Sequence, residues 1–449
     1  MTENYSYDND GLLTGSGDYT LTRDTQNGYV AQLSDGTLTQ NRSYNSYGEI
    51  TEVSDNTFTY QLTNRDNAGA ITQKSETLNG TTTTYNYTYD DLGRLTEACR
   101  VGGTHQMCET YAYDNNGNRL STTVNGETTT ASYTLDDQLE VYGDNSYRYD
   151  DDGYLIEKIT PDGTTTYSYG TMGQLLQVIT PNHTISYKHN ALNQRVAKLV
   201  DGVTVEKYLW RDLTTLLAIY DANDNLLQRF EYADQRMPVS MNSNGTKYYL
   251  HYDQVGSLRA VSDTNGQIVK EVVYDTFGNI VSDSNPDFKV PFGFAGGLYD
   301  GDIGLTRFGY RDYDAYTGKW TAKDPIGFTG GDSNLYGYVL NNPVNFLDPT
   351  GESAHVPGFI GAGAIGGAIV GIIDASLNAR CMREAWEIFW MNVSTGALAG
   401  LFASGAGFFG AVAGEAGGIG LNALIGLNGV PANNTCTPPP HTPPPSVCE

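Results

Sequence analysis

A short unit, Tyr-x-Tyr-Asp-x-x-Gly-x-Leu, recurs along the first part of the chain and constrains the fold more than any other feature. The best copies begin at Tyr5, Tyr87, Tyr111, Tyr147 and Tyr167. The spacing of their turn glycines indicates a period of roughly 20 residues, and a fixed period of this size is typical of an array of supersecondary units. A single unit cannot bury its apolar face alone, so we expect each unit to stack on its neighbours.

Each unit has the pattern of half a β-hairpin. Tyr-x-Tyr places two aromatic side chains on one face of a strand, where such residues pack well. Asp-x-x-Gly is a turn in which Asp caps its own backbone and Gly supplies a positive φ. Helix signals are almost absent in this region, so we predict a mainly β fold with one long, spiralling antiparallel sheet. Each Tyr either packs against the next repeat or, if exposed, stacks on a sugar ring, and periodicity does not separate the two.

The composition excludes one class of function and divides the chain in two. Asp plus Glu total 52 against 26 Lys plus Arg, which gives a net charge of −26. Such a surface repels phosphate backbones, so we predict no nucleic-acid partner. All 33 Tyr lie at or before Tyr338, and the chain beyond Gly351 is rich in Gly and Pro instead. The acidic N-terminus lacks the apolar core of a signal peptide. We therefore expect that this protein is secreted or at the cell surface and leaves the cell by a route that does not use a signal peptide.

The repeat and residues 290–351, which contain PFGFAGGLYDGDIGL and end in NFLDPTG, resemble the Rhs/YD-repeat family and its Rhs-associated core. The resemblance covers about three quarters of the chain. It implies a YD-repeat array over 1–285 that forms a partial or full shell, and a core over 286–351 that plugs it. It also implies a variable segment over 352–430, followed by a Pro-rich tail over 431–449. In polymorphic toxins of this family that segment is a toxin with a cognate immunity protein, delivered by secretion machinery to neighbouring cells.

Two Asp-Pro-x-Gly turns in the core begin at Asp324 and Asp348. Such turns are rigid, and a pair of them could bring two carboxylates together to share a proton and activate water. The resemblance implies an aspartyl self-cleavage after the second turn, between Gly351 and Glu352. It also implies that Arg311 orients a carboxylate or stabilises the oxyanion. Relatives commonly carry an apolar residue where this chain has Glu352, whose charge would oppose a developing oxyanion. The alternative is that both turns are purely structural.

The cysteine and histidine patterns predict a disulfide and no metal site. Cys99 and Cys108 flank a Gly-Gly turn, so they can face each other across a hairpin and pair in an oxidising compartment. The six His show no metal-ligand spacing. We therefore predict neither a metal nor another cofactor.

Beyond residue 351 the pattern changes to that of a small α-helical, Gly/Ala-rich segment. Two stretches, 356–373 and 388–414, carry no charged residue and are long enough to span a membrane. Glycines four residues apart would line one helix face and allow close helix packing: Gly363, Gly367, Gly371, Gly410, Gly414 and Gly418. The alternative is a compact helical hairpin that serves as a linker.

The leading interpretation is a shell protein that encloses and presents its C-terminal segment, a membrane-active toxin, in interbacterial competition. Self-cleavage would make it an autoprotease acting once in cis. Two alternatives remain open at this point. One is a cell-surface protein that binds carbohydrate on its Tyr-lined sheet, and the other is an orphan C-terminal fragment of a longer Rhs protein with no activity of its own.

Overall fold

The computed structural model describes residues 4–356. The chain divides into two compact units, Met1–Gly358 and Phe359–Glu449, and the described residues lie in the first. The mainly β fold predicted from the repeat is confirmed, because the described residues form strands joined by turns and three short 3-10 helices. The glycines from Gly363 to Gly418 and the uncharged stretches 356–373 and 388–414 lie outside the described residues, apart from Val356.

Twenty-eight strands form one sheet in which each strand pairs antiparallel with the next along the chain. The strands are β1 (Tyr5–Tyr7), β2 (Leu13–Ser16), β3 (Tyr19–Arg23), β4 (Val30–Ser34), β5 (Thr39–Tyr44), β6 (Ile50–Ser54), β7 (Phe58–Arg65), β8 (Ile71–Leu78), β9 (Thr81–Tyr89), β10 (Leu95–Val101), β11 (Met107–Tyr113), β12 (Arg119–Val124), β13 (Glu127–Tyr133), β14 (Leu139–Tyr142), β15 (Asn145–Tyr149), β16 (Leu155–Thr160), β17 (Gly163–Tyr169), β18 (Leu175–Ile179), β19 (Thr184–His189), β20 (Arg195–Val200), β21 (Val203–Trp210), β22 (Leu216–Tyr220), β23 (Leu226–Glu231), β24 (Ser240–Ser243), β25 (Thr246–Tyr252), β26 (Leu258–Asp263), β27 (Ile268–Tyr274) and β28 (Ile280–Asp283).

The Asp-x-x-Gly turn has the geometry that its sequence predicts. The Oδ1 atom of Asp90 accepts hydrogen bonds from the backbone N–H groups of Leu92 and Arg94, at 3.0 and 2.9 Å. Gly93 closes the turn with a φ of 77°, a conformation that costs glycine little. In a degenerate copy, Asp137 takes the same place with a φ of 61°, which Asp and Asn tolerate better than other side chains.

The two Tyr have different structural roles in most copies of the unit, although in the first copy Tyr5 and Tyr7 are both exposed. The first is buried, as at Tyr87 and Tyr111, both 6% exposed, so these rings are not available to stack on a sugar. The second lies at a β-bulge, and in several copies, such as Tyr89 and Tyr113, it donates its hydroxyl to the first backbone carbonyl of the preceding strand. Tyr113, for example, donates to the carbonyl of Leu95 at 2.8 Å. Where this contact occurs, a repeat is tied to the one before it by a side chain as well as by strand pairing.

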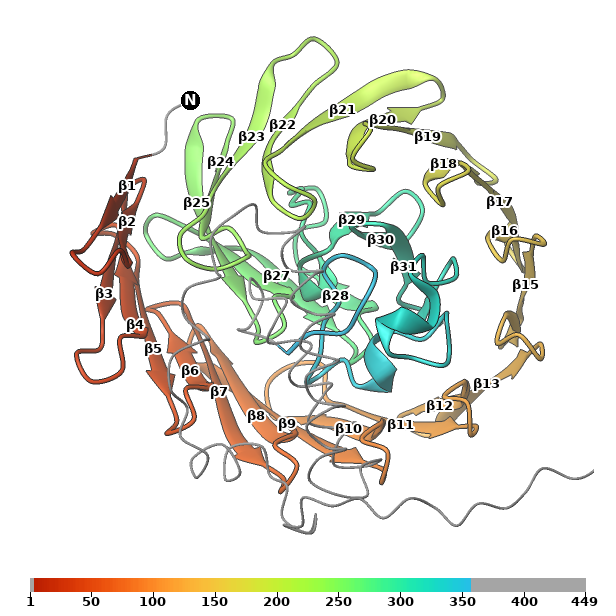
Figure 1. The fold of residues 1–449 in the computed structure, drawn as a ribbon, viewed down its shortest axis with the longest axis horizontal. Coiled ribbons are helices and arrows are strands. Elements are labelled where there is room, and N and C mark those ends of the chain that lie inside the picture. Colours follow the sequence, from red (N-terminus) through yellow and green to blue (C-terminus); the bar gives the residue numbers. More distant parts are fainter. Residues whose placement is uncertain (1–3, 357–449) are drawn as a thin grey trace, which may run out of the picture. The chain divides into compact units, whose positions relative to one another are not determined.

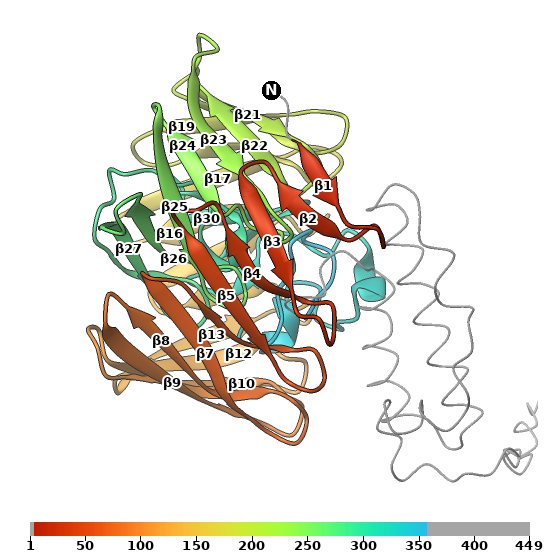
Figure 2. The same cartoon turned by 90° about the vertical axis from the view of Figure 1, so that its left-hand side faces the viewer.

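The sheet curls until its first strands contact strands near its end (Figures 1 and 2). The hydroxyl of Tyr19 in β3 lies 2.6 Å from that of Ser240 in β24, and the ammonium of Lys247 in β25 lies 2.8 Å from Asp35. Residues more than 200 positions apart in the sequence are thus neighbours. These polar contacts form a seam between the early and the late strands.

Residues 292–356, which we call the plug, fill the inside of the curled sheet (Figure 1). The plug contains β29 (Leu298–Asp300), β30 (Leu305–Phe308), β31 (Arg311–Asp314), β32 (Lys319–Trp320) and the 3-10 helices η1 (Phe294–Gly296), η2 (Gly327–Gly330) and η3 (Val339–Asn341).

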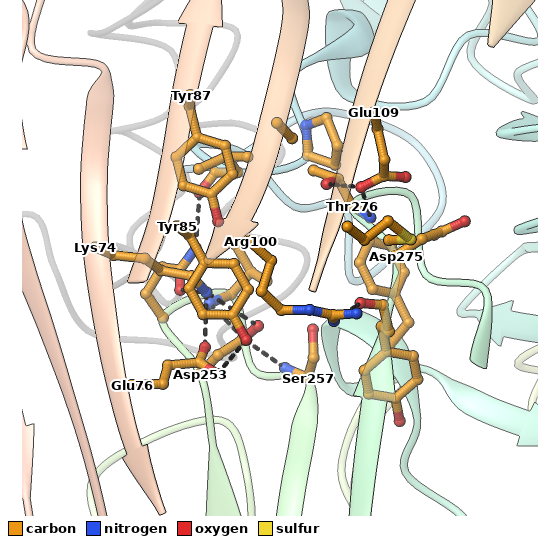
Figure 3. Close-up of a pocket in the computed structure, with 18 of the residues that line it drawn as sticks. Lys74, Glu76, Tyr85, Tyr87, Arg100, Glu109, Asp253, Ser257, Asp275 and Thr276 are labelled. Carbon is orange, nitrogen blue, oxygen red and sulfur yellow. Dashed lines mark hydrogen bonds and ion pairs between the residues drawn. The ribbon is translucent and has the colours of Figure 1, made fainter. Parts of the chain in front are cut away.

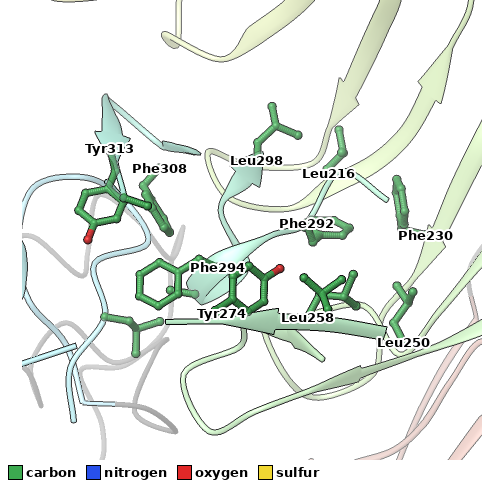
Figure 4. Close-up of a cluster of buried hydrophobic side chains, with 14 of the residues drawn as sticks. Leu216, Phe230, Leu250, Leu258, Tyr274, Phe292, Phe294, Leu298, Phe308 and Tyr313 are labelled. Carbon is green, nitrogen blue, oxygen red and sulfur yellow. The ribbon is translucent and has the colours of Figure 1, made fainter. Parts of the chain in front are cut away.

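Aromatic side chains of the plug pack against the concave face of the sheet in one core (Figure 4). The rings of Phe230 in β23 and Phe292 in the plug lie 5.0 Å apart, edge to face. Within the plug, Tyr313 and Tyr338 are fully buried, with ring centres 4.4 Å apart. Each such side chain contributes about 1.5–3 kcal/mol by burial, so the sheet and the plug stabilise each other.

The plug also contacts the turns of the repeats directly. Three of its side chains donate hydrogen bonds to the carbonyl oxygens of turn glycines that belong to different repeats. The pairs are Asn342 with Gly93 at 2.9 Å, Asn341 with Gly117 at 2.9 Å, and Tyr336 with Gly153 at 2.8 Å. A defined stretch of the plug is therefore aligned with a defined set of repeats.

Candidate active site around Asp324 and Asp348

The first Asp-Pro-x-Gly motif leads into η2. The backbone N–H of Asp324 donates to the carbonyl of Leu335 at 3.0 Å, and Asp324 Oδ1 accepts the N–H of Ile326 at 2.9 Å. Gly327 donates back to the Asp324 carbonyl at 3.0 Å and has a φ of 59°. The motif is thus a self-capped turn that fixes the direction of the Asp324 side chain.

The second motif forms a closed loop. Leu347 and His355 exchange two backbone hydrogen bonds, at 2.9 and 2.7 Å, across the residues between them. Inside this loop, Asp348 Oδ1 accepts the N–H groups of Gly351 and Glu352, at 2.9 and 3.1 Å. The segment that follows the motif is therefore folded back onto the Asp348 carboxylate.

Arg311 in β31 brings the two motifs together. Its Nη2 atom lies 2.7 Å from Asp324 Oδ2 and 3.3 Å from Asp348 Oδ2. Since one nitrogen contacts both carboxylates, their oxygens cannot be farther apart than the sum of these distances. Its Nε atom donates to the carbonyl oxygen of Gly351 at 2.6 Å. The ring of Trp320 lies 4.2 Å from the guanidinium carbon and limits its movement.

Burial changes the acidity of this site. It raises the pKa of Asp324 to about 6, and Arg311 only partly offsets this effect. Burial also raises the pKa of Glu352 to about 7, with further contributions from the charges of Asp348 and Asp324. The carboxyl groups of Asp324 and Glu352 therefore keep their protons to a higher pH than Asp and Glu side chains ordinarily do.

The geometry suits cleavage of the peptide bond between Gly351 and Glu352. Its carbonyl oxygen contacts Arg311 and its N–H contacts Asp348, so both sides of this bond are held. A guanidinium at the carbonyl stabilises the negative charge that develops there when water attacks. A protonated Asp324 beside a second carboxyl group, that of Asp348, can supply the acid and base that such a step needs.

Gly330 in η2 is a site residue that the sequence analysis did not identify. A Cβ atom at this position would lie 2.6 Å from the carbonyl oxygen of Glu352 and 2.9 Å from Asp324 Oδ2. Only glycine leaves space for the loop and the carboxylate together. The adjacent pair Gly330-Gly331, six residues after Asp324, is the signal that could have drawn attention to it.

A second polar cluster lines a cavity of about 50 Å³ between β8–β11 and the turns after β25 and β27 (Figure 3). Glu76 accepts hydrogen bonds there from Lys74, Tyr85 and Arg259, at 2.8 to 3.0 Å. Burial would raise its pKa, but Arg259 and Lys74 hold the pKa of Glu76 at about 2. The cavity is roughly a third the size of one that admits benzene, so it has room for a few waters. The cluster joins β8 and β9 to β26 and so belongs to the seam.

Glu109 extends the seam beside this cavity. Its carboxylate accepts the hydroxyl of Tyr111 at 2.8 Å and that of Thr276 at 2.6 Å. Burial raises the pKa of Glu109 to about 7, and the nearby charge of Asp275 raises it further. A buried acid that joins strands distant in sequence makes this seam sensitive to pH.

Among the remaining predicted residues, Cys99 and Cys108 occupy directly paired positions of β10 and β11, and the structure joins them in a disulfide. Residues 4–356 contain no group of three or more His, Cys, Asp or Glu side chains arranged to hold a metal ion. No helix within the same residues is long and apolar enough to cross a membrane.

Comparison with known proteins places this chain among proteins with the same repeat. The Teneurin YD-shell family model matches residues 1–344. Teneurin-3 of Danio rerio is 31% identical over 337 residues, which is 71% of this chain but 12% of that protein. The tRNA3(Ser)-specific nuclease WapA of Bacillus spizizenii is 32% identical over 165 residues, 35% of this chain and 7% of WapA.

A solved structure supports the fold. The crystal structure of TcdB2-TccC3-Cdc42 matches with a TM-score of 0.56 at 18% identity, over 78% of this chain and 20% of that one. The chain therefore spans a small part of the length of each relative. Since the family model covers well over half of the chain, and the sheet and its repeats agree with it, the protein belongs to the Rhs/YD-repeat family of YD-shell proteins.

Proposed function

We propose that this protein is a shell that encloses and presents its C-terminal segment, and that it releases this segment by one aspartyl self-cleavage between Gly351 and Glu352. The observation that supports the proposal is the position of Arg311. One guanidinium contacts Asp324, Asp348 and the carbonyl oxygen of Gly351. Two buried carboxylates need a cation in either case, but the contact of this cation with the carbonyl oxygen of Gly351 places positive charge where the oxyanion would form.

In this mechanism Asp324 is the acid and Asp348 is the base. Asp348 activates a water that attacks the carbonyl carbon of Gly351, and Arg311 stabilises the oxyanion. Asp324 donates its proton to the leaving nitrogen of Glu352. The carbon–nitrogen bond then breaks, leaving a carboxylate on Gly351 and a free amine on Glu352.

The released segment is the cargo, and its context is interbacterial competition. Its uncharged stretches, 356–373 and 388–414, favour action on a membrane. The partners expected in this context are a cognate immunity protein and the machinery that delivers the shell outside the producing cell. The similarity to WapA, a nuclease by name, is consistent with a toxin at the C-terminal end of such a shell.

Mass spectrometry of the full-length chain tests the release step. We expect the wild-type protein to yield a C-terminal fragment that begins at Glu352, and the Asp348→Asn variant to yield no fragment that begins there. An intact wild-type chain after long incubation at acidic and neutral pH would refute self-cleavage. Expression of residues 352–449 alone tests the cargo: loss of membrane potential supports a membrane-active toxin, and normal growth contradicts it.

A further inference from the structure

A serine and a histidine lie together immediately after the second motif. Ser353 Oγ is 3.3 Å from His355 Nε2, a hydrogen-bonding distance for the two groups. The backbone of His355 is fixed by its bridge to Leu347, so the imidazole is attached to the closed end of the loop. The described contacts of the aspartyl site do not use either side chain.

The loop restrains the peptide bond that precedes Ser353. The N–H of Glu352 is held by Asp348, and the Glu352 carbonyl lies against the backbone of Gly330. A serine hydroxyl always lies close to the carbonyl carbon of the residue before it, and attack there closes a five-membered ring. What most serines lack is a base in contact with the hydroxyl and a loop that cannot relax.

His355 is suited to be that base. Burial lowers the pKa of His355, the positive charge of Arg236 lowers it further, and Asp348 opposes both effects. The imidazole is therefore neutral at physiological pH and has a lone pair to accept a proton. Ser353 and Glu352 are only partly buried, so water can reach an intermediate that forms between them.

We propose that Ser353 is a second nucleophile, which cleaves the Glu352–Ser353 bond by a shift of the acyl group from nitrogen to oxygen, with His355 as the base. Ser353 Oγ forms a bond to the carbonyl carbon of Glu352 and passes its proton to His355 Nε2. His355 then gives this proton to the backbone nitrogen of Ser353 as the carbon–nitrogen bond breaks. The product is an ester between Glu352 and Ser353. Water hydrolyses the ester to a Glu352 carboxylate and a free Ser353 hydroxyl.

This reaction does not require Asp324, and it differs from the proposed aspartyl cleavage in the bond that is broken. The two reactions give C-terminal fragments that differ by one glutamate residue. Each can therefore fail while the other is observed.

The test is mass spectrometry of the full-length chain and of its variants, with and without hydroxylamine, which cleaves esters. We expect a fragment that begins at Ser353 in the wild type and in Asp324→Asn. We expect this fragment to be lost in Ser353→Ala and reduced at least tenfold in His355→Gln. Hydroxylamine should increase its yield and leave a hydroxamate on Glu352. Ser353→Cys should restore the fragment, because a thiol performs the same shift through a thioester.

Two results would overturn the proposal. One is the absence of any Ser353 fragment or hydroxamate in the wild type and in Ser353→Cys. The other is a Ser353 fragment that persists in Ser353→Ala, since the hydroxyl would then have no part in the cleavage. Circular dichroism of each variant checks that the β-sheet is retained.

Discussion

Arg311 donates a hydrogen bond from Nε to the carbonyl oxygen of Gly351 at 2.6 Å, across 40 positions of sequence. The same side chain binds the carboxylates of both Asp-Pro-x-Gly motifs. A carbonyl that accepts from a guanidinium is polarised before any reaction begins, and the contact strengthens as negative charge develops on the oxygen. Because of this contact, we interpret the two turns as a candidate active site rather than as structural turns alone.

Removal of either carboxylate should stop release of the C-terminal segment. We expect Asp324→Asn and Asp348→Asn each to lower the rate of cleavage after Gly351 at least a hundredfold, because an amide cannot act as acid or base. The appearance of the Glu352 fragment, followed by mass spectrometry, measures the rate. Asp162→Asn, on an exposed turn of the sheet, is the matched control and should cleave like the wild type. Equal rates in all four proteins would exclude the dyad.

Self-cleavage should slow as the pH rises. The acid is Asp324, with a pKa of about 6, so the rate should fall about tenfold per pH unit above this value. Above about pH 7, Glu352 also ionises and places a second negative charge near the oxyanion, so the wild-type rate should fall more steeply. In the Glu352→Gln variant, the rate should fall only by the tenfold per pH unit that comes from Asp324. A wild-type rate that increased with pH through this range would contradict the assignment of Asp324.

The seam should weaken as the pH rises. In the unfolded chain Glu109 loses its proton near the ordinary glutamate pKa of 4.5, whereas in the folded protein burial raises the pKa to about 7. The folded state therefore binds more protons in this window, and the free energy of unfolding falls across it by at most about 3 kcal/mol from this group. Denaturant titrations at several pH values measure the slope. Glu109→Gln should flatten it, and an unchanged slope would show that Glu109 is not the titrating group.

Reduction of the disulfide should cost moderate stability. Cys99 and Cys108 close a short loop, 9 positions apart, in a hairpin that is already paired. The loss of loop-closure entropy predicts a decrease of about 2–3 kcal/mol in the free energy of unfolding. Thermal denaturation with and without reductant, compared with Cys99→Ser/Cys108→Ser, measures it. The double variant should be insensitive to reductant, and any remaining effect would point to another cysteine.

The contacts between plug and turns should be measurable one at a time. Asn342→Ala removes the donor to the carbonyl of Gly93 at 2.9 Å and the acceptor of the Asn345 side-chain amide at 2.8 Å, so we expect a loss of about 1–2 kcal/mol in the free energy of unfolding. Asn223→Ala, on an exposed turn far from the plug, is the control and should change stability by less than half as much. If both variants lose the same amount, the Asn342 contact adds no stability of its own.

The repeat predicted most of the sheet, because turn chemistry and alternation are local properties. Asp90 and Gly93 form the turn that their types require. The opposite roles of Tyr111 and Tyr113 were not predictable, since the burial of one and the long-range bond of the other depend on a bulge. The contact of Tyr19 with Ser240 could not be predicted from the sequence either, because it depends on the curl of the whole sheet.

For the candidate site, the sequence identified Asp324, Asp348 and Arg311 through a resemblance. The resemblance gave Arg311 a role at a carboxylate or at the oxyanion, but its contact with Gly351 was not predictable, because that contact depends on a loop closed by Leu347 and His355. Gly330 was missed because its importance lies in the space that it leaves to other residues. Local chemistry is readable in a sequence, whereas close approach between distant segments is a property of the assembled fold.

The bonds from the plug to the turn glycines have a consequence for how such chains vary. Asn342, Asn341 and Tyr336 each contact a different repeat, at Gly93, Gly117 and Gly153. These three contacts require the plug and this part of the array to keep matching spacings. Insertion or deletion of one repeat between Gly93 and Gly153 would move at least one of these turn glycines away from its partner in the plug. A change in the number of repeats in this part of the array therefore requires a matching change in the plug.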